Sequence, residues 1–144
     1  FADDPGKIEK RNEEICLVEE GKKELFIPGN VSKLYSTLNL QKFSEALLRS
    51  KEIALKVPGE TIIAVLKGMI TRPSRVSVME SGEVPYLWIL GTFDNLISCE
   101  AIQSKVHLPK NADMVVLENS GHMGFIEEED RSVKVIADFV NKLQ

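Results

Sequence analysis

Apolar residues recur at helical spacing through the first half of the chain. Asp4 followed by Pro5 has the form of an N-cap and a first-turn proline, and predicts an exposed amphipathic helix over residues 7–23. A loop at Pro28-Gly29-Asn30 is expected next, and then a short helix from Val31 to Leu38.

Two further helices are predicted before any strand. One has Leu40, Phe43, Leu47 and Ala54 on one face and ends near Lys56, before the breaker Pro58-Gly59. The next carries the clearest apolar stripe in the chain, which we expect to be mostly buried: Ile62, Ile63, Leu66, Met69 and Ile70. Residues 72–83 are predicted to be a linker.

The pattern changes in the second half. The continuous apolar run from Tyr86 to Leu90 is typical of a parallel strand covered on both faces, and a second strand is predicted at Met114 to Leu117. Ala101, Ile102 and Val106 fit a crossover helix between the two strands. From Glu127, an acidic first turn predicts a last helix that closes the sheet, with an apolar stripe at Val133, Ile136, Ala137 and Val140.

The expected fold is therefore α/β, with a helical region over residues 1–83 and an α/β region over residues 84–144. Two parallel strands with two helices cannot bury both sheet faces without more strands. We therefore expect an upstream half of the same fold. The abrupt start at Phe1, which is neither an initiator methionine nor part of a signal peptide, fits a truncated chain.

Composition narrows the function classes. The 144 residues are 43% hydrophobic and 28% charged, as in a globular domain, and no apolar run approaches the ~20 residues needed to cross a bilayer. A net charge of -4 with interspersed signs favours small or neutral partners over nucleic acid or membrane surfaces. Cys16 and Cys99 form neither a C-x-x-C motif nor a metal-ligand pattern, so neither a metal site nor a redox motif is expected and a cytoplasmic setting is the default.

Each predicted strand ends in a glycine-containing loop with one titratable side chain. Asp94 follows the first strand in Gly91-Thr-Phe-Asp94, and His122 follows the second in Gly121-His122-Met-Gly124-Phe125. A carboxylate that holds one imidazole nitrogen leaves the other free to take a proton from a hydroxyl. We therefore expect Asp94 and His122 to approach hydrogen-bonding distance, because the ends of neighbouring parallel strands lie together.

These two turns, in the order acid then histidine, resemble the C-terminal end of an α/β-hydrolase. The resemblance is close over residues 84–144 and looser upstream, where successive helices resemble the cap of that family. It implies that Asp94 and His122 are the acid and base of a serine hydrolase that acts on a small ester, amide or related acyl bond and needs no cofactor. The family's G-x-S-x-G nucleophile elbow does not occur in this sequence, so the chain alone is expected to be inactive.

Other interpretations stay open. The chain could belong to a non-catalytic protein that binds a ligand or partner on the same scaffold. Glu118 ranks second as a partner for the histidine, whereas His107 is expected to be a surface residue and Cys99 a structural one. The Asn30-Val-Ser32 sequon has meaning only in a secreted protein. Neither the substrate nor the oligomeric state can be deduced from the sequence.

Overall fold

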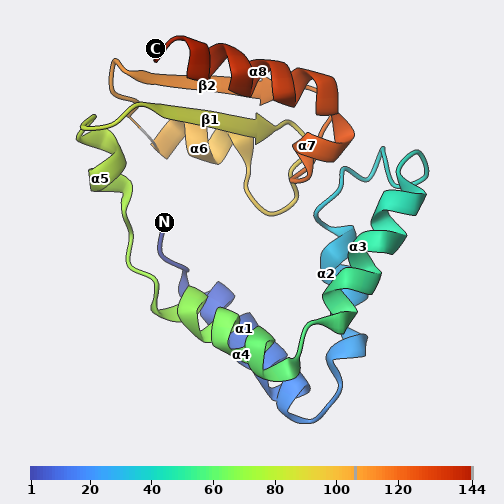
Figure 1. Ribbon diagram of the computed structural model, residues 1–144. Coiled ribbons are helices and arrows are strands. Elements are labelled where there is room, and N and C mark those ends of the chain that lie inside the picture. Colours follow the sequence, from blue (N-terminus) through green and yellow to red (C-terminus); the bar gives the residue numbers. More distant parts are fainter. Residues whose placement is uncertain (106, 144) are drawn as a thin grey trace.

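The computed structural model describes residues 1–105 and 107–143 and has two parts (Figure 1). Residues 5–80 contain helices only, and residues 86–141 contain a two-stranded parallel sheet with helices on both faces. The expected α/β fold, a succession of helices followed by two parallel strands with flanking helices, is confirmed. No helix among these residues is long and apolar enough to span a membrane.

The helical part is built from two pairs of packed helices. Its elements are α1 (Pro5–Glu19), the 3-10 helix η1 (Lys23–Leu25), α2 (Ile27–Ser32), α3 (Ser44–Lys56), α4 (Gly59–Thr71) and α5 (Val76–Glu80). Helix α1 packs along α4, and α2 packs against α3 (Figure 1). The segment between α2 and α3 returns to the loops at the end of the sheet.

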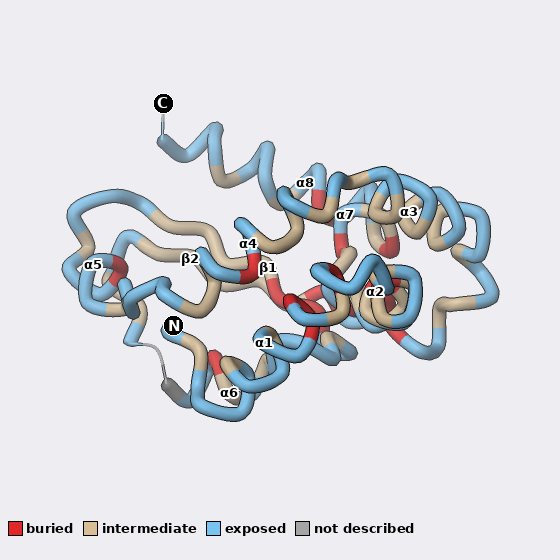
Figure 2. The backbone as a smooth tube through the Cα atoms, turned by 90° about the horizontal axis from the view of Figure 1, so that it is seen from below, coloured by how far each residue is buried: buried red, intermediate tan, exposed pale blue. Residues whose placement is uncertain are grey.

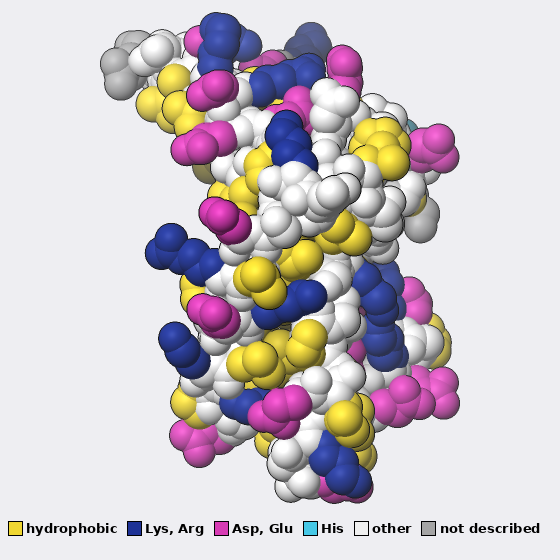
Figure 3. All heavy atoms as spheres, turned by 90° about the vertical axis from the view of Figure 1, so that its right-hand side faces the viewer, with side chains coloured by type: hydrophobic (Ala, Val, Ile, Leu, Met, Phe, Trp, Pro, Cys, Tyr) yellow, Lys and Arg dark blue, Asp and Glu magenta, His cyan; other side chains and the backbone are white. Residues whose placement is uncertain are grey.

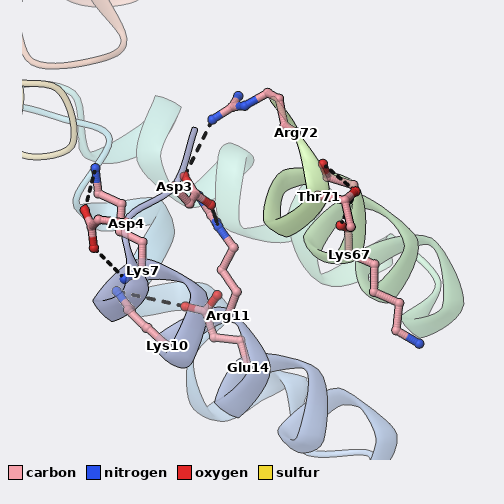
Figure 4. Close-up of polar contacts among 10 residues, drawn as sticks. Asp3, Asp4, Lys7, Lys10, Arg11, Glu14, Lys67, Thr71 and Arg72 are labelled. Carbon is pink, nitrogen blue, oxygen red and sulfur yellow. Dashed lines mark hydrogen bonds and ion pairs between the residues drawn. The ribbon is translucent and has the colours of Figure 1, made fainter. Parts of the chain in front are cut away.

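Polar contacts fix the first residues of the chain to both helices of the first pair (Figure 4). As predicted, the side chain of Asp4 caps α1, accepting the Lys7 amide at 2.9 Å, and Pro5 opens the helix. The shielded carboxylate of Asp3 pairs with Arg11 of α1 and, at 3.6 Å, with Arg72 at the end of α4. These contacts tie the beginning of α1 to the end of α4.

Two predictions about the middle of the helical part are wrong. Pro28-Gly29-Asn30 lies inside α2, where the proline occupies the first turn, instead of forming a loop. The expected helix from Val31 to Leu38 ends at Ser32, and turns follow up to residue 43. The predicted linker also contains α5, a helix of five residues that is too short to show a periodic pattern.

The apolar stripe of α4 is less buried than expected. Leu66 is 8% exposed, but the other four stripe residues are only half-buried. Helix α3 leaves Leu48 and Ile53 exposed. Figure 3 looks at the side of the molecule where α3 lies, and apolar side chains there alternate with lysine, arginine and acidic residues.

The sheet consists of β1 (Tyr86–Gly91) and β2 (Ala112–Leu117), paired in parallel from Tyr86 opposite Ala112 to Gly91 opposite Leu117. Within the described residues β1 pairs with a strand, β2, on one edge only. Helix α6 (Cys99–Lys105) covers one face and α8 (Glu129–Asn141) the other (Figure 1). The predicted helix position Val106 lies outside the described residues. Met79, Leu90 and Ile102 form the buried core beneath β1.

The predicted stripe of α8 does not face the sheet. Val133, Ile136, Ala137 and Val140 are all exposed, and α8 is mostly pale blue in Figure 2. Val135 and Phe139 are half-buried instead. A sheet of two strands offers too little surface to cover every apolar side chain of this helix. The short helix α7 (Gly124–Glu127) joins β2 to α8.

Candidate active site

Asp94 lies in the loop that follows β1. The loop is fixed against the end of β2, because Thr92 N–H donates to the Leu117 carbonyl at 3.0 Å and Phe93 N–H donates to the Ser120 carbonyl at 2.9 Å. One carboxylate oxygen of Asp94, Oδ1, accepts the Leu96 and Ile97 amides at 2.8 and 3.0 Å. This turn leaves the other oxygen, Oδ2, free to bind a second partner.

That partner is His122, in the loop after β2. Its Nδ1 lies 2.8 Å from Asp94 Oδ2, so the expected approach of the two side chains is confirmed. The Asp94 side chain is only 7% exposed, whereas that of His122 is 38% exposed. The acid is therefore shielded, and the imidazole remains accessible from solvent.

The pairing defines what the imidazole can do. An ionised carboxylate only accepts hydrogen bonds, so in the neutral ring Nδ1 carries the hydrogen and Nε2 carries the lone pair. No hydrogen bond among the described residues involves Nε2. The ring is thus held as an acceptor with an accessible nitrogen, which is the geometry of a general base.

Glycines beside both residues allow the two loops to touch. A Cβ at Gly91 would lie 2.1 Å from the Gly121 carbonyl oxygen, and a Cβ at Gly121 would lie 2.5 Å from the Ser36 amide nitrogen. Such distances are far below van der Waals contact, so any side chain here would separate the loops. The glycines that drew attention to Asp94 and His122 in the sequence are required by this close approach.

The helical part supplies a third element of the site, residues 33–39, which we call the bracket segment. The Leu34 carbonyl accepts the amides of His122 and Met123 at 2.8 and 3.1 Å. The Asn95 side chain, next to Asp94, donates to the Lys33 and Tyr35 carbonyls at 3.4 and 3.3 Å. The bracket segment therefore holds the acid loop and the histidine loop together.

The bracket segment was not found from the sequence, which predicted a helix there. A helix would use these backbone carbonyls internally, whereas here they accept from loops some 60 to 90 residues away. Tyr35 and Ser36 are fully buried, but apolar periodicity carries no signal for such long-range bonds.

Glu128, also missed in the sequence, steadies the start of the histidine loop. Its Oε2 accepts the Ser120 hydroxyl at 2.6 Å and the Asn119 amide at 2.8 Å, and Arg131 lies beside Oε1. Burial by itself raises the pKa of this carboxyl, but the bonds from Ser120 and Asn119 and the charge of Arg131 outweigh it. The pKa of Glu128 therefore lies below its ordinary value.

The other sequence candidates lie apart from the pair. Glu118 is exposed and faces Arg131 at 3.7 Å, so it is not the partner of the histidine. The exposed His107 faces Glu80, as expected of a surface residue. Cys99 packs against the core cluster of Met79, Leu90 and Ile102, and the Asn30 side chain donates to Glu14 at 2.7 Å.

No group of His, Cys, Asp or Glu side chains in the described part of the chain is arranged to hold a metal ion. A hollow of about 510 Å³ lies between β1 and α5, lined by Phe1, Met79 and Trp88 among others. Neither Asp94 nor His122 lines it, so it is separate from the pair.

No protein-family model matches the chain, and no curated protein matches it. Solved structures do. A thermophilic esterase from Thermogutta terrifontis, solved with malate bound, superposes with a TM-score of 0.89 at 20% identity, covering 98% of this chain and 52% of that one.

Two further solved structures also superpose on this chain. The enol-lactonase from Burkholderia xenovorans has a TM-score of 0.78 at 15% identity, covering 90% of this chain and 49% of its own. An α/β hydrolase enzyme from a Medee basin deep-sea metagenome library has a TM-score of 0.73 at 16% identity, covering 97% and 52%. The chain spans about half the length of these structures, and at such identities the likeness establishes the fold alone.

Proposed function

We propose that this chain, whose fold is that of the C-terminal part of an α/β-hydrolase, supplies the acid and the base of a serine hydrolase. The supporting observation is the pair of Asp94 and His122 at 2.8 Å, with the acid shielded and the base accessible, on neighbouring strand ends. The other half of the fold would contribute the nucleophile. The helices of residues 1–83 would form the cap over the site.

In this mechanism a serine from the other half attacks the carbonyl carbon of a small ester, amide or related acyl compound. His122 Nε2 takes the serine proton, and Asp94 stabilises the imidazolium and keeps the ring in one tautomer. His122 then returns the proton to the leaving group, and water releases the acyl group by the reverse sequence. Amides of the other half stabilise the oxyanion, and no cofactor is needed.

The proposal is tested by ester hydrolysis with p-nitrophenyl acetate. Residues 1–144 alone should show no turnover, because the chain has no G-x-S-x-G elbow. A longer protein with the N-terminal half should be active, and in it His122→Ala should remove most turnover. There, Asp94→Asn should lower kcat by up to about 10⁴-fold, because the ring then adopts the wrong tautomer.

His107→Ala is the matched control, since that histidine is exposed and pairs only with Glu80. An active longer protein that is insensitive to His122→Ala would contradict the proposal. Turnover by residues 1–144 alone that is lost in His122→Ala would place the nucleophile in this chain, and Cys99 or one of its serines would have to be reconsidered. A longer protein without the elbow would favour the binding protein instead.

A further inference from the structure

Glu127, the last residue of α7, is an acidic side chain with only 5% exposure. Its Oε1 accepts the Gly121 amide at 2.8 Å. Its Oε2 accepts the Ser36 amide at 3.0 Å and the Asn39 side-chain amide at 2.7 Å. Among the ion pairs of the described residues none involves Glu127, so these three N–H groups are what its carboxylate binds.

The three donors come from the two segments that meet at the site. Gly121 directly precedes His122, while Ser36 and Asn39 belong to the bracket segment. The carbonyl of Leu34, in that segment, accepts the His122 amide. Glu127 therefore connects Gly121 to the bracket segment. The hydrogen bond between the Leu34 carbonyl and the His122 amide, which positions His122, joins the same two segments.

A hydrogen bond to Asp94 requires the imidazole to be placed within a few tenths of an ångström. The loop that carries His122 is held by bonds from the His122 and Met123 amides to the Leu34 carbonyl of the bracket segment. We propose that Glu127 is a positioning residue for His122, which locks Gly121 to the bracket segment so that Nδ1 meets Asp94. The inference rests on the proposed function, because the position of His122 is important only if His122 is the base of the hydrolase.

Glu127→Gln changes this bridge while keeping the size of the side chain. The amide has one oxygen and one NH2 group, so one side of the bridge must present N–H to N–H. The Gly121 amide or the donors of the bracket segment then lose their acceptor, and the histidine loop should shift. Glu129→Gln is the matched control, because Glu129 undergoes the same chemical change two residues away and is exposed.

The test is a long-range ¹H–¹⁵N correlation spectrum of the histidine rings in residues 1–144, at a pH where the rings are neutral. The ring nitrogens report the tautomer directly, and a role in stability alone would leave them unchanged in the folded protein. In the unsubstituted chain and in Glu129→Gln, His122 should show a protonated Nδ1 and an unprotonated Nε2. In Glu127→Gln, the two shifts should move toward the average of both tautomers.

His107 provides the internal reference and should not change in any variant. If His122 keeps a single tautomer in folded Glu127→Gln, or if Glu129→Gln alters it equally, the inference is overturned. If Glu127→Gln does not fold, Asn39→Ala decides: it removes the side-chain donor to Glu127 Oε2, together with its bond to the Asn119 carbonyl, and should cause the same movement of the shifts. An unchanged tautomer there overturns the inference, whereas an inactive longer protein with an intact tautomer counts against the proposed function alone.

Discussion

Asp94 uses its two carboxylate oxygens for different purposes. Oδ1 closes the turn with the Leu96 and Ile97 amides, and Oδ2 binds His122. Asp94 therefore closes a turn and binds the histidine at the same time. The turn fixes the direction of the oxygen that meets the imidazole. The side chain of Asp94 is therefore held in one orientation when it binds His122.

Gly121 is the residue at which the close approach can be tested by stability. Gly121→Ala should destabilise the protein by about 1 to 3 kcal/mol, because the added carbon meets the backbone of Ser36 and Tyr35. Gly68→Ala is the control: it lies within α4 with nothing near its Cβ, and should raise stability by roughly 0.5 to 1 kcal/mol. Urea unfolding measures both, and equal effects would mean that the histidine loop does not touch the bracket segment.

Glu128 gives the histidine loop a dependence on pH. Its lowered pKa means that its contribution to stability is complete above the ordinary glutamate range and is lost as the pH falls through the lowered value in the folded state. Glu128→Gln should therefore cost about 1 to 3 kcal/mol at pH ~7 and much less at pH ~3. Urea unfolding at both values, with Glu129→Gln as the control, measures the difference, and an equal cost at both would contradict this account.

Helix α4 shows how far apolar spacing can be trusted at the scale of an element. The spacing placed five residues on one face, and that face does pack on α1, but only Leu66 is fully buried. A single partner helix covers one line of side chains and leaves the flanking ones half-exposed. The same reasoning applies to α8, where the predicted stripe is exposed.

Neighbouring residues of α4 therefore differ sharply in what they contribute. Leu66→Ala should cost roughly 2 to 5 kcal/mol, since it empties a packed position between α4 and α1. Val65→Ala, at a position that is 52% exposed, should change stability by less than about 0.5 kcal/mol. Thermal and urea unfolding distinguish the two, and a small loss for Leu66→Ala would show that α4 does not depend on this contact.

At the scale of the whole molecule, the α/β part is open on several sides. The exposed Val133, Ile136 and Val140 of α8, together with a β1 edge that has no strand partner in the described residues, leave apolar surface uncovered. Surfaces of this kind are usually covered by another segment or molecule. The other half of an α/β-hydrolase would do so.

A charged substitution on α8 tests whether the other half of the fold covers this helix. In residues 1–144 alone, Ile136→Lys should change the free energy of unfolding by less than about 0.5 kcal/mol, because the side chain is exposed. In a longer protein that covers α8, the same change should cost several kcal/mol, because it buries an unpaired charge. Urea unfolding of both proteins measures this, and an equal small effect would mean that α8 stays exposed.

Features that depend on neighbours in the sequence could be predicted, and features that depend on long-range contacts could not. Both strands, the cap at Asp4 and the loops of Asp94 and His122 follow from short stretches, because each depends on neighbours in sequence. The bracket segment and Glu127 could not be predicted, because their partners lie up to 91 residues away and leave no periodic trace. The segment between Ser32 and Ser44 forms turns instead of a helix, because its polar groups bond to those distant partners.

The bond between Ser36 and Glu127 also affects how fast the site can form. It closes a loop of 91 residues, which is most of the chain, and contacts of such separation are reached late in folding because their loop entropy is lost before they stabilise anything. Helices α1 and α4 and the two strands can each form from nearer contacts. We therefore expect the alignment of Asp94 with His122 to form in the final stage of folding, after the elements that carry the two residues already exist.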